Sequence, residues 1–356
     1  MMRVMLENYG NPSSMHFMGR DASAELFNAR RSIADALGAR TDETYFTSGG
    51  TESANWAIFG SSQALFRKGR HIITTAIEHD AVLKPVKKLE KEGWEVTYLK
   101  PDSAGRITAE GFAAELREDT VLASVMLVNN ETGAVNPIRE FSDEIKRRGL
   151  RTALHTDAVQ GFCKIPFTVK SLGVDLLSVS SHKIHGPKGV GALFVRNSAR
   201  LFPLFFGGGQ ETGRRAGTEA LPAIAGFGVA ARLGWQKLGE TAAYVRQLRD
   251  HTVGRLKARL PGVVIIGEGD SPHLLSFSLP GYKSEVLMNC LENEGICVSK
   301  GSACKKGLRS RVLEAMRLSD DVIDGALRVS FSHYNTSDEA DIFVETLAGA
   351  LASLVV

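Results

Sequence analysis

The stretch Ser-Ser-His-Lys-Ile-His-Gly-Pro-Lys-Gly-Val-Gly at residues 180–191 follows an apolar, strand-like run at 174–179. A second such run, at 151–156, ends just before Asp157, so Lys183 and Asp157 each stand shortly beyond a predicted strand. In an open α/β sheet, ligands bind in the crevice outside the carboxyl ends of the strands. We therefore expect both side chains to project toward one ligand site.

A lysine and an aspartate in this arrangement indicate a pyridoxal phosphate site. This cofactor acts as an electron sink, and it needs an amine for its Schiff base and an acid that keeps its pyridine nitrogen protonated. Lys183 supplies the amine and Asp157 the acid. A lone lysine after a strand is ordinarily a solvated surface residue. Here the neighbouring Ser180 and His182, which can add donors to the phosphate, and three nearby glycines favour the cofactor site.

The glycine-rich segment Thr-Ser-Gly-Gly-Thr-Glu-Ser-Ala-Asn at 47–55 is a second candidate contact for such a cofactor. It precedes an apolar helical pattern, so its backbone amides and the Thr51 hydroxyl can hold a phosphate at a helix N-terminus. A tight turn with a capping threonine would explain the same residues. Because an amine and an acid already point to a phosphorylated cofactor, the phosphate cradle is the preferred interpretation.

Polar residues after other predicted strands can complete the site. His79 can lie flat over a pyridine ring and still exchange protons. Gln160 can hydrogen-bond the phenolic oxygen of the cofactor. Asn129 and Asn130 follow a long apolar run, where a side-chain amide can orient a bound amino acid.

Apolar, β-rich runs alternate with helical patterns along the first two thirds of the chain. This rhythm predicts an α/β fold whose large domain is built on a mainly parallel, doubly wound sheet. The predicted strands cover residues 71–75, 96–99, 121–128, 152–156, 175–179 and 192–195.

A smaller α/β domain is predicted at the C-terminal end. A long amphipathic helix is expected from about 230 to 260, and it would join the two domains. We place the large, cofactor-binding domain at 9–240 and the small domain at 241–356. The strands predicted for the small domain are 263–266, 274–279 and 326–331.

Composition indicates an ordinary globular protein rather than a nucleic-acid-binding or membrane protein. The 356 residues are 43% hydrophobic and 23% charged, with 36 glycines, and they suffice for two domains. The net charge is +3, and the basic residues are spread along the chain rather than gathered in one run, so no direct nucleic-acid partner is expected.

The cysteines and the N-terminus suggest a cytoplasmic protein. Four cysteines without a C-x-x-C pattern are too few for a disulfide scaffold, so free thiols in a reducing compartment are expected. The first residues lack the apolar region of a signal peptide, and no run reaches the length of a membrane span.

Ordered motifs along nearly the whole chain resemble the cysteine desulfurases, pyridoxal phosphate enzymes of the class V aminotransferase group. The motifs are Tyr-Gly-Asn-Pro-Ser-Ser (9–14), Thr-Ser-Gly-Gly-Thr-Glu-Ser (47–53), Glu-His (78–79), Val-Asn-Asn-Glu-Thr-Gly (128–133), Asp-Ala-Val-Gln (157–160), Ser-His-Lys (181–183), Gly-Gly-Gly-Gln-Glu-Thr-Gly-Arg-Arg-Ala-Gly-Thr-Glu (207–219), Gly-Ser-Ala-Cys (301–304) and Arg-Val-Ser-Phe-Ser (328–332).

The resemblance implies a role for each candidate residue. At the cofactor ring it implies Lys183 as the Schiff-base lysine, His79 stacked on the ring, Asp157 at the pyridine nitrogen and Gln160 at the phenolic oxygen. At the phosphate it implies Gly50, Thr51, Ser180 and His182, together with Thr218 from the other subunit of a homodimer. For the substrate it implies Arg328, whose guanidinium suits a carboxylate, assisted by Asn130.

Cys304 is the residue that the resemblance singles out for sulfur chemistry. A thiolate on an exposed loop can attack the sulfur of the bound L-cysteine, take it as a persulfide and leave alanine, and a sulfur-acceptor protein then receives it. Lys305 and Lys306 next to it should favour the thiolate. Cys163, Cys290 and Cys297 stand in apolar contexts and are expected to be small buried side chains.

The chain departs from the family pattern at its N-terminal end, and other functions for the same residues stay open. Family members usually carry a segment like Leu-Asp-Asn-Ala-Ala-Thr-Thr-Pro ahead of the Tyr-Gly-Asn-Pro motif, and only eight residues precede Tyr9, so that segment is expected to be absent. The same site residues would also serve a selenocysteine lyase or another class V lyase or aminotransferase. A non-catalytic scaffold that docks sulfur-acceptor proteins is a third possibility, although it would not need Lys183, Asp157 and Cys304.

Overall fold

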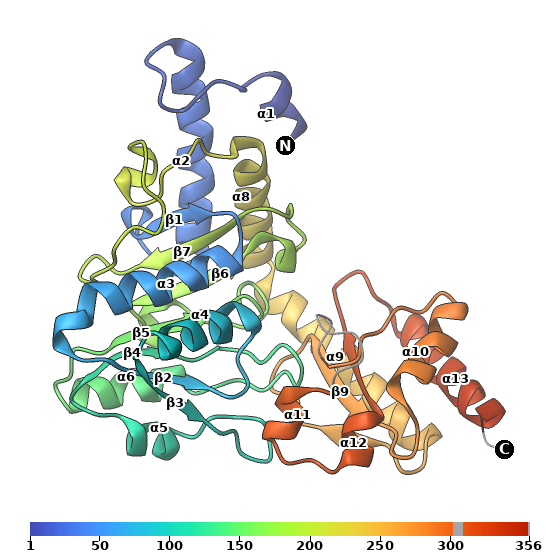
Figure 1. Ribbon diagram of the computed structural model, residues 1–356. Coiled ribbons are helices and arrows are strands. Elements are labelled where there is room, and N and C mark those ends of the chain that lie inside the picture. Colours follow the sequence, from blue (N-terminus) through green and yellow to red (C-terminus); the bar gives the residue numbers. More distant parts are fainter. Residues whose placement is uncertain (302–308, 355–356) are drawn as a thin grey trace. The chain divides into compact units, whose positions relative to one another are not determined.

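The computed structural model describes residues 1–301 and 309–354 (Figure 1). The chain divides into two compact units. Unit 1 comprises Met1–Leu99, Ala109–Leu127 and Pro137–Leu238, and unit 2 comprises Lys100–Thr108, Val128–Asn136 and Gly239–Val356.

Unit 1 is built on a seven-stranded sheet with the order β1-β7-β6-β5-β4-β2-β3. The pairs β2–β3, β2–β4, β4–β5 and β5–β6 are parallel, whereas β7 runs antiparallel to both of its neighbours. The predicted mainly parallel sheet is therefore confirmed. The strands are β1 (Thr44–Thr47), β2 (His71–Thr75), β3 (Glu95–Leu99), β4 (Thr120–Ser124), β5 (Ala153–Asp157), β6 (Leu176–Ser180) and β7 (Gly191–Val195).

The five central strands of this sheet are buried along their whole length. Such continuous burial is typical of parallel strands whose two faces are both covered by helices. On one face, α3 and α4 contribute Trp56, Ile58 and Val86 to a core that also holds Ile72 and Leu122 of the sheet. The helices of unit 1 are α1 (Met2–Leu6), α2 (Phe17–Leu37), α3 (Gly50–Leu65), α4 (Asp80–Lys91), α5 (Ala109–Glu115), α6 (Ile138–Arg147), α7 (Val169–Leu172) and α8 (Leu221–Gln236).

Unit 2 contains a three-stranded antiparallel sheet in the order β10-β9-β8. Its core is formed by Phe277, Leu287, Leu327, Phe343 and Val344, among others. The strands are β8 (Val264–Ile266), β9 (Leu274–Ser278) and β10 (Ala326–Ser330), and the helices are α9 (Leu238–Arg259), α10 (Ser284–Asn293), α11 (Arg311–Ala315), α12 (Asp320–Asp324) and α13 (Ser337–Leu354).

Two helices occupy the stretch where one long helix was expected. Helix α8 ends at Gln236, and its C-cap Lys237 has φ −103° and ψ 10°, which interrupts the helical path before α9 begins. Within the described ranges, none of these helices combines the length and the apolar character that a membrane crossing requires.

Candidate active site

Lys183 lies in the short 3₁₀ helix Ser181–Ile184 that directly follows β6, and its side chain is half-buried. The helix ends at His185, which has a left-handed φ of 63°. The next residue must be small, because a Cβ on Gly186 would lie 2.2 Å from the Ser181 hydroxyl oxygen. The left-handed His185 and the small Gly186 therefore allow a sharp turn just after β6, and this turn places Lys183 at the carboxyl end of the strand.

Asp157 is the last residue of the neighbouring strand β5 and is buried. Its Oδ1 accepts a hydrogen bond of 2.9 Å from the Val159 N–H, and its carbonyl accepts one from the Leu127 N–H at 2.9 Å. Burial raises the pKa of this carboxyl, while electrostatic interactions with His79 and Lys183 act in the opposite direction. The structure thus brings Asp157, His79 and Lys183 within electrostatic reach of one another.

A buried imidazole fixes the strand that carries Asp157. His155 on β5 is fully buried, with Nδ1 at 2.8 Å from the Ser124 hydroxyl of β4 and Nε2 at 2.9 Å from the Ser178 hydroxyl of β6. Burial lowers the pKa of His155 to about 3, so the ring is neutral. This side-chain link across three parallel strands adds to the backbone pairing and was not predicted from the sequence.

The glycine-rich segment forms a close turn against the end of β6. Gly49 has φ +153°, a conformation that favours glycine, and Gly50 begins α3. A Cβ on Gly50 would lie 2.7 Å from Val159 Cγ2 and 3.6 Å from Ser180 Cβ, and one on Gly191 would lie 2.7 Å from the Gly49 Cα. The turn therefore packs beside Ser180 with space for hydrogen only, at the N-terminus of a 16-residue helix.

Ser180 and His182 lie together beside this turn. The Ser180 hydroxyl and His182 Nδ1 are 2.9 Å apart. Burial and the nearby Lys183 and Lys188 lower the pKa of His182, so the ring favours its neutral form. A neutral imidazole linked to a hydroxyl can still donate through one ring nitrogen.

His79 is held in place as the N-cap of α4. Its Nδ1 accepts a hydrogen bond of 3.1 Å from the Ala81 N–H, which assigns the remaining ring proton to Nε2. The preceding Glu78 is buried, and its Oε1 accepts from the Thr75 hydroxyl at 2.9 Å and from the Met126 N–H at 2.8 Å. Glu78 thus anchors the loop that presents His79, a role that the sequence motif alone did not reveal.

The other predicted contacts of unit 1 lie at or near the surface. Gln160 is half-buried three residues after Asp157, and Thr51 is exposed in the first turn of α3. Thr218 is exposed in the loop before α8.

Two ion pairs fix the loop that precedes Thr218. Nη1 and Nη2 of Arg30 each donate a 2.6 Å hydrogen bond to the buried Glu211 carboxylate, which also accepts from the Phe46 N–H at 2.9 Å. Arg215 pairs with Glu52 of α3 at 2.9 Å. The loop is therefore tied both to the sheet and to the helix that starts at Gly50.

The two residues predicted to bind substrate belong to unit 2. Arg328 lies on β10, and its Nη1 donates a hydrogen bond of 2.8 Å to the Asn130 carbonyl oxygen. The adjacent Asn129 is fully buried, and its Oδ1 accepts from the Glu131 and Thr132 N–H groups at 2.9 and 3.0 Å. The Asn129 amide is thus used to shape the loop, and the loop carbonyl at 130 orients Arg328.

A buried carboxyl lies beside Arg328 in the same unit. Glu131 is 6% exposed, and the Ser310 hydroxyl donates to its Oε2. Burial raises the pKa of Glu131, and the charges of Arg328 and Arg311 lower it. A Cβ on Gly301 would lie 2.5 Å from the same oxygen, so one carboxyl contacts residues on both sides of 302–308.

The predicted sulfur-carrying residue, Cys304, lies outside the described residues, as do Lys305 and Lys306. Cys163 is buried as expected, and burial raises the pKa of its thiol to about 12. The expectation of burial was wrong for Cys297, which is exposed, and only partly right for Cys290, which is half-buried. Ile296 and Val298 pack on the core of unit 2, so the alternation of an extended segment turns Cys297 outward.

The residues of unit 1 fit the cofactor predicted from the sequence. A buried carboxyl suits a protonated pyridine nitrogen, and a half-buried lysine lies within its electrostatic reach. The glycine turn at a helix N-terminus, flanked by Ser180 and His182, is suited to a phosphate.

The chain belongs to the Aminotransferase class-V family, which it matches over residues 1–343. Curated relatives are cysteine desulfurases. Cysteine desulfurase IscS of Dictyoglomus turgidum is 41% identical over 352 residues, or 98% of this chain and 89% of the relative. Putative cysteine desulfurase IscS 1 of Bacillus subtilis is 42% identical over 355 residues, or 98% of this chain and 92% of the relative.

Solved structures of similar proteins agree with this assignment. A NifS-like protein is 38% identical with a TM-score of 0.94, and the match covers 99% of this chain and 94% of that one. DndA from Streptomyces lividans is 36% identical with a TM-score of 0.80, and the match covers 93% and 94% of the two chains. The predicted resemblance and fold class are thereby confirmed.

Proposed function

We propose that this protein is a pyridoxal phosphate-dependent cysteine desulfurase, which converts L-cysteine to L-alanine and passes on the sulfur. The observation that carries the proposal is the buried Asp157 carboxyl at the end of β5, which interacts electrostatically with both Lys183 and His79. The relatives named above, at about 40% identity over nearly the whole chain, support this activity.

When bound, pyridoxal phosphate supplies an electron sink for the carbanion that forms at the amino acid Cα. Asp157 would hold the proton on the pyridine nitrogen, and Gln160 would donate to the phenolic oxygen. Gly50, Thr51, Ser180 and His182 would hold the phosphate, together with Thr218 from the other subunit. His79 would pack against the ring.

Lys183 is proposed to bind the cofactor covalently at rest and to move a proton during turnover. Its amine, once released, removes the Cα proton of the substrate and later returns a proton. The substrate carboxylate is proposed to bind the Arg328 guanidinium, which the Asn130 carbonyl orients. Arg328 thereby selects an α-amino acid.

Cys304 is proposed to take the sulfur. Its thiolate attacks the substrate sulfur and forms an S–S bond, while the Cβ–S bond breaks and leaves its electron pair on Cβ, which gains a proton to give alanine. The persulfide then passes to a thiol of an acceptor protein, or a reductant releases it as sulfide.

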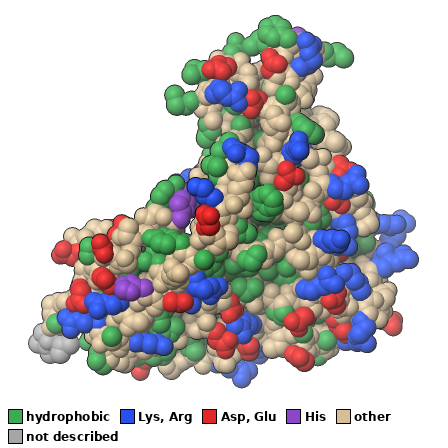
Figure 2. Space-filling model, turned by 180° about the vertical axis from the view of Figure 1, so that it is seen from behind, with side chains coloured by type: hydrophobic (Ala, Val, Ile, Leu, Met, Phe, Trp, Pro, Cys, Tyr) green, Lys and Arg blue, Asp and Glu red, His purple; other side chains and the backbone are tan. Residues whose placement is uncertain are grey.

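A homodimer is part of this proposal. Many large apolar side chains in the first 27 residues are exposed, Met2 at 75%, Met15 at 93% and Phe17 at 64% among them. Figure 2 shows apolar side chains gathered at the top of the view. Patches of this kind commonly mark protein–protein interfaces. Light scattering should therefore give twice the chain mass, and Phe17→Asp should favour the monomer.

The activity is tested by measuring sulfide and alanine released from L-cysteine in the presence of dithiothreitol. Equal amounts of both products are expected, and Cys304→Ala should abolish them while the cofactor stays bound. Cys297→Ala, which removes an exposed thiol of the same unit, is the matched control and should remain active. Alanine production that survives Cys304→Ala with selenocysteine as substrate would instead indicate a selenocysteine lyase.

A further inference from the structure

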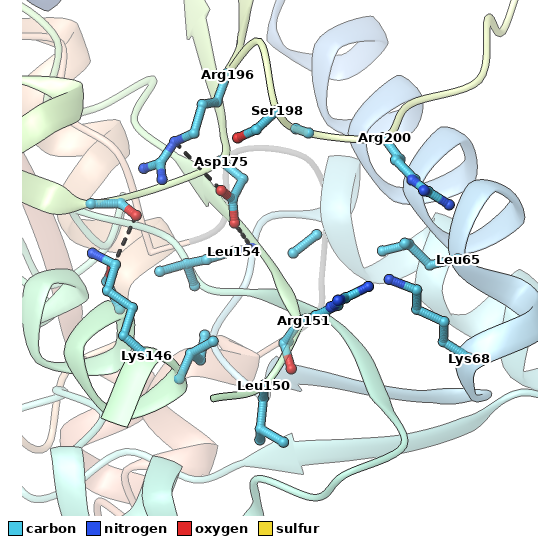
Figure 3. A pocket seen from close by; sticks show the side chains of 16 residues that line it. Leu65, Lys68, Lys146, Leu150, Arg151, Leu154, Asp175, Arg196, Ser198 and Arg200 are labelled. Atoms are coloured by element: carbon cyan, nitrogen blue, oxygen red, sulfur yellow. Dashed lines mark hydrogen bonds and ion pairs between the residues drawn. The ribbon is translucent and has the colours of Figure 1, made fainter. Parts of the chain in front are cut away.

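A cavity of about 330 Å³ lies in unit 1 at the sheet edge opposite to the predicted cofactor site (Figure 3). It is bordered by the start of β5 at Ala153, by Asp175 just before β6, and by residues 196–200 after β7. These meet at one edge because β7 runs antiparallel to β6. Four residue steps along β5 separate Ala153 from Asp157, which corresponds to about 13 Å. The cavity is therefore distinct from the site that contains Asp157.

The side chains that line this cavity carry a strong excess of positive charge. Five are cationic, and one, Asp175, is acidic; the cationic ones are Lys68, Lys146, Arg151, Arg196 and Arg200. Asp175 is already satisfied, since it accepts from the Leu154 N–H at 3.0 Å and pairs with Arg196 at 3.5 Å. Lys146 also acts electrostatically on Asp175. The other three cationic side chains, Lys68, Arg151 and Arg200, have no acidic partner among the residues that line the cavity.

In Figure 3 the side-chain ends of Lys68 and Arg151 point toward each other, and the Arg200 guanidinium lies above them beside Leu65. Over residues 1–301 and 309–354, none of the three forms an ion pair. Lys68, Arg151 and Arg200 are exposed, and partial desolvation together with the charges of the two arginines lowers the pKa of Lys68, so both guanidinium groups act on its ammonium. Mutual repulsion of this kind is relieved when an anion binds between the cations.

The remaining wall of the cavity combines polar residues, Ser142, Thr152 and Ser198, with an apolar part. Leu65, Leu150 and Leu154 line it beside the cations, and the Ser198 hydroxyl lies at its margin. A volume of about 330 Å³ falls in the lower range of small-molecule sites, which are mostly apolar with a few fixed polar groups. An inorganic ion would leave the apolar wall uncovered, whereas a phosphate joined to a small organic group would contact both parts.

We propose that this cavity is a binding site for a small organic phosphate, whose phosphate group lies between Lys68, Arg151 and Arg200. Arginine is suited to this role because its planar guanidinium donates two parallel hydrogen bonds to a phosphate. The organic part packs on the leucine side chains. Charge attraction accounts for recognition of the phosphate, and the size of the cavity limits the ligand to about one nucleotide.

Calorimetric titration of the cofactor-loaded protein tests the proposal, with AMP, ribose 5-phosphate, adenosine and inorganic phosphate as separate probes. Bound cofactor keeps the other phosphate-binding turn occupied. At least one organic phosphate should bind with a Kd below about 1 mM and about tenfold more tightly than adenosine. Raising the salt concentration should weaken this binding, because the contact is largely ionic.

Two variants and a matched control locate the binding. Arg151→Gln and Arg200→Gln should each weaken binding of the organic phosphate about tenfold. Arg67→Gln removes the same charge from the exposed residue next to Lys68, outside the cavity lining, and should leave binding unchanged. All variants should keep the cofactor absorbance and tryptophan fluorescence of the parent.

Three results would overturn the proposal. The first is failure of both organic phosphates to bind, and the second is equal weakening by Arg67→Gln and Arg151→Gln. The third is a single-stranded oligonucleotide that binds more tightly than AMP and depends on the same arginines, since that would make the site a nucleic-acid contact.

Discussion

Acidification should destabilise unit 1 through one buried imidazole, that of His155. The ring lies between the Ser124 and Ser178 hydroxyls, and burial lowers its pKa from 6.5 to about 3. In the unfolded chain the imidazole takes up a proton as the pH falls below 6.5, whereas in the folded protein it stays neutral down to about pH 3. The stability that the neutral ring provides is therefore complete above pH 6.5 and is lost as the pH falls through this window.

The size of the effect follows from the two pKa values. Between about pH 7.5 and about pH 5, the extra proton bound by the unfolded state lowers the free energy of unfolding by about 2 kcal/mol. Replacement of the imidazole by an uncharged amide, His155→Gln, removes this contribution. The variant should be less stable at every pH, but its loss of stability on acidification should be smaller by about 2 kcal/mol than that of the parent.

Urea unfolding followed by tryptophan fluorescence measures the free energy of unfolding of unit 1 at each pH for the parent and for His155→Gln. The three tryptophans of the chain, Trp56, Trp94 and Trp235, all belong to unit 1, as does His155. The cofactor is removed first, because its own pH-dependent binding would otherwise contribute. Groups other than His155 titrate alike in both proteins and cancel when the two pH dependences are subtracted.

Ile72→Val serves as the control for a simple loss of packing. Ile72 is fully buried in the same sheet, and the change should cost about 1 kcal/mol without removing a titrating group. Its pH dependence should match that of the parent. If His155→Gln also retains the parent's pH dependence, the imidazole does not titrate between the two states as argued, and the reasoning is refuted.

Three further substitutions test the site and its supports. Gly191→Ala places a methyl group against Gly49 and should weaken cofactor binding about tenfold in a fluorescence titration; unchanged affinity would show that the turn can shift. Arg328→Lys loses the planar guanidinium and should raise the KM for L-cysteine about tenfold with the cofactor spectrum unaltered; an unchanged KM would remove Arg328 from the substrate site. Glu211→Ala leaves Arg30 without its partner and should cost about 3 kcal/mol in urea unfolding, and a cost near zero would mean that water replaces the carboxylate.

The sequence predicted the strands that carry the chemistry because they read as continuous apolar runs. Strands β5 and β6 were identified in this way, together with Asp157 at the end of β5 and Lys183 shortly after β6. The run at 121–128 was predicted as one strand, but β4 ends at Ser124. The N–H groups of Val125 and Leu127 still bond to β5, so the residues after β4 stay buried and apolar without continuing as a strand.

Strand β1 was not predicted, and its neighbour in the sheet explains why. Thr44–Thr47 is four residues long and pairs antiparallel with β7, which lies almost 150 positions further along the chain. A short run with a partner so distant leaves only a weak local pattern. The segments 100–108 and 128–136 were likewise not assigned to the small domain, because they belong to unit 2 only through contacts with residues far along the chain.

The supporting residues of the site were also beyond the sequence pattern. Glu78 stands in the Glu-His motif and His155 in the predicted strand 152–156, but their roles depend on partners 48 and 23 to 31 positions away. The burial of such a carboxyl and imidazole cannot be predicted without those partners, because glutamate is usually exposed and histidine is often at least partly exposed.

The spatial clustering of charged side chains is the property that the sequence alone predicts least well. Basic residues are dispersed along the chain, and for that reason no direct nucleic-acid partner was expected. Dispersal in sequence does not imply dispersal in space. Lys68, Arg151 and Arg200 come from a helix end, a strand start and a strand exit, and the fold of the sheet brings them to one cavity. Within the described parts of the chain no carboxylate pairs with these three exposed side chains, so solvent screens their repulsion but no acidic group cancels it. A bound organic phosphate would neutralise these charges, and because it binds the folded protein it should also raise the thermal midpoint of unit 1.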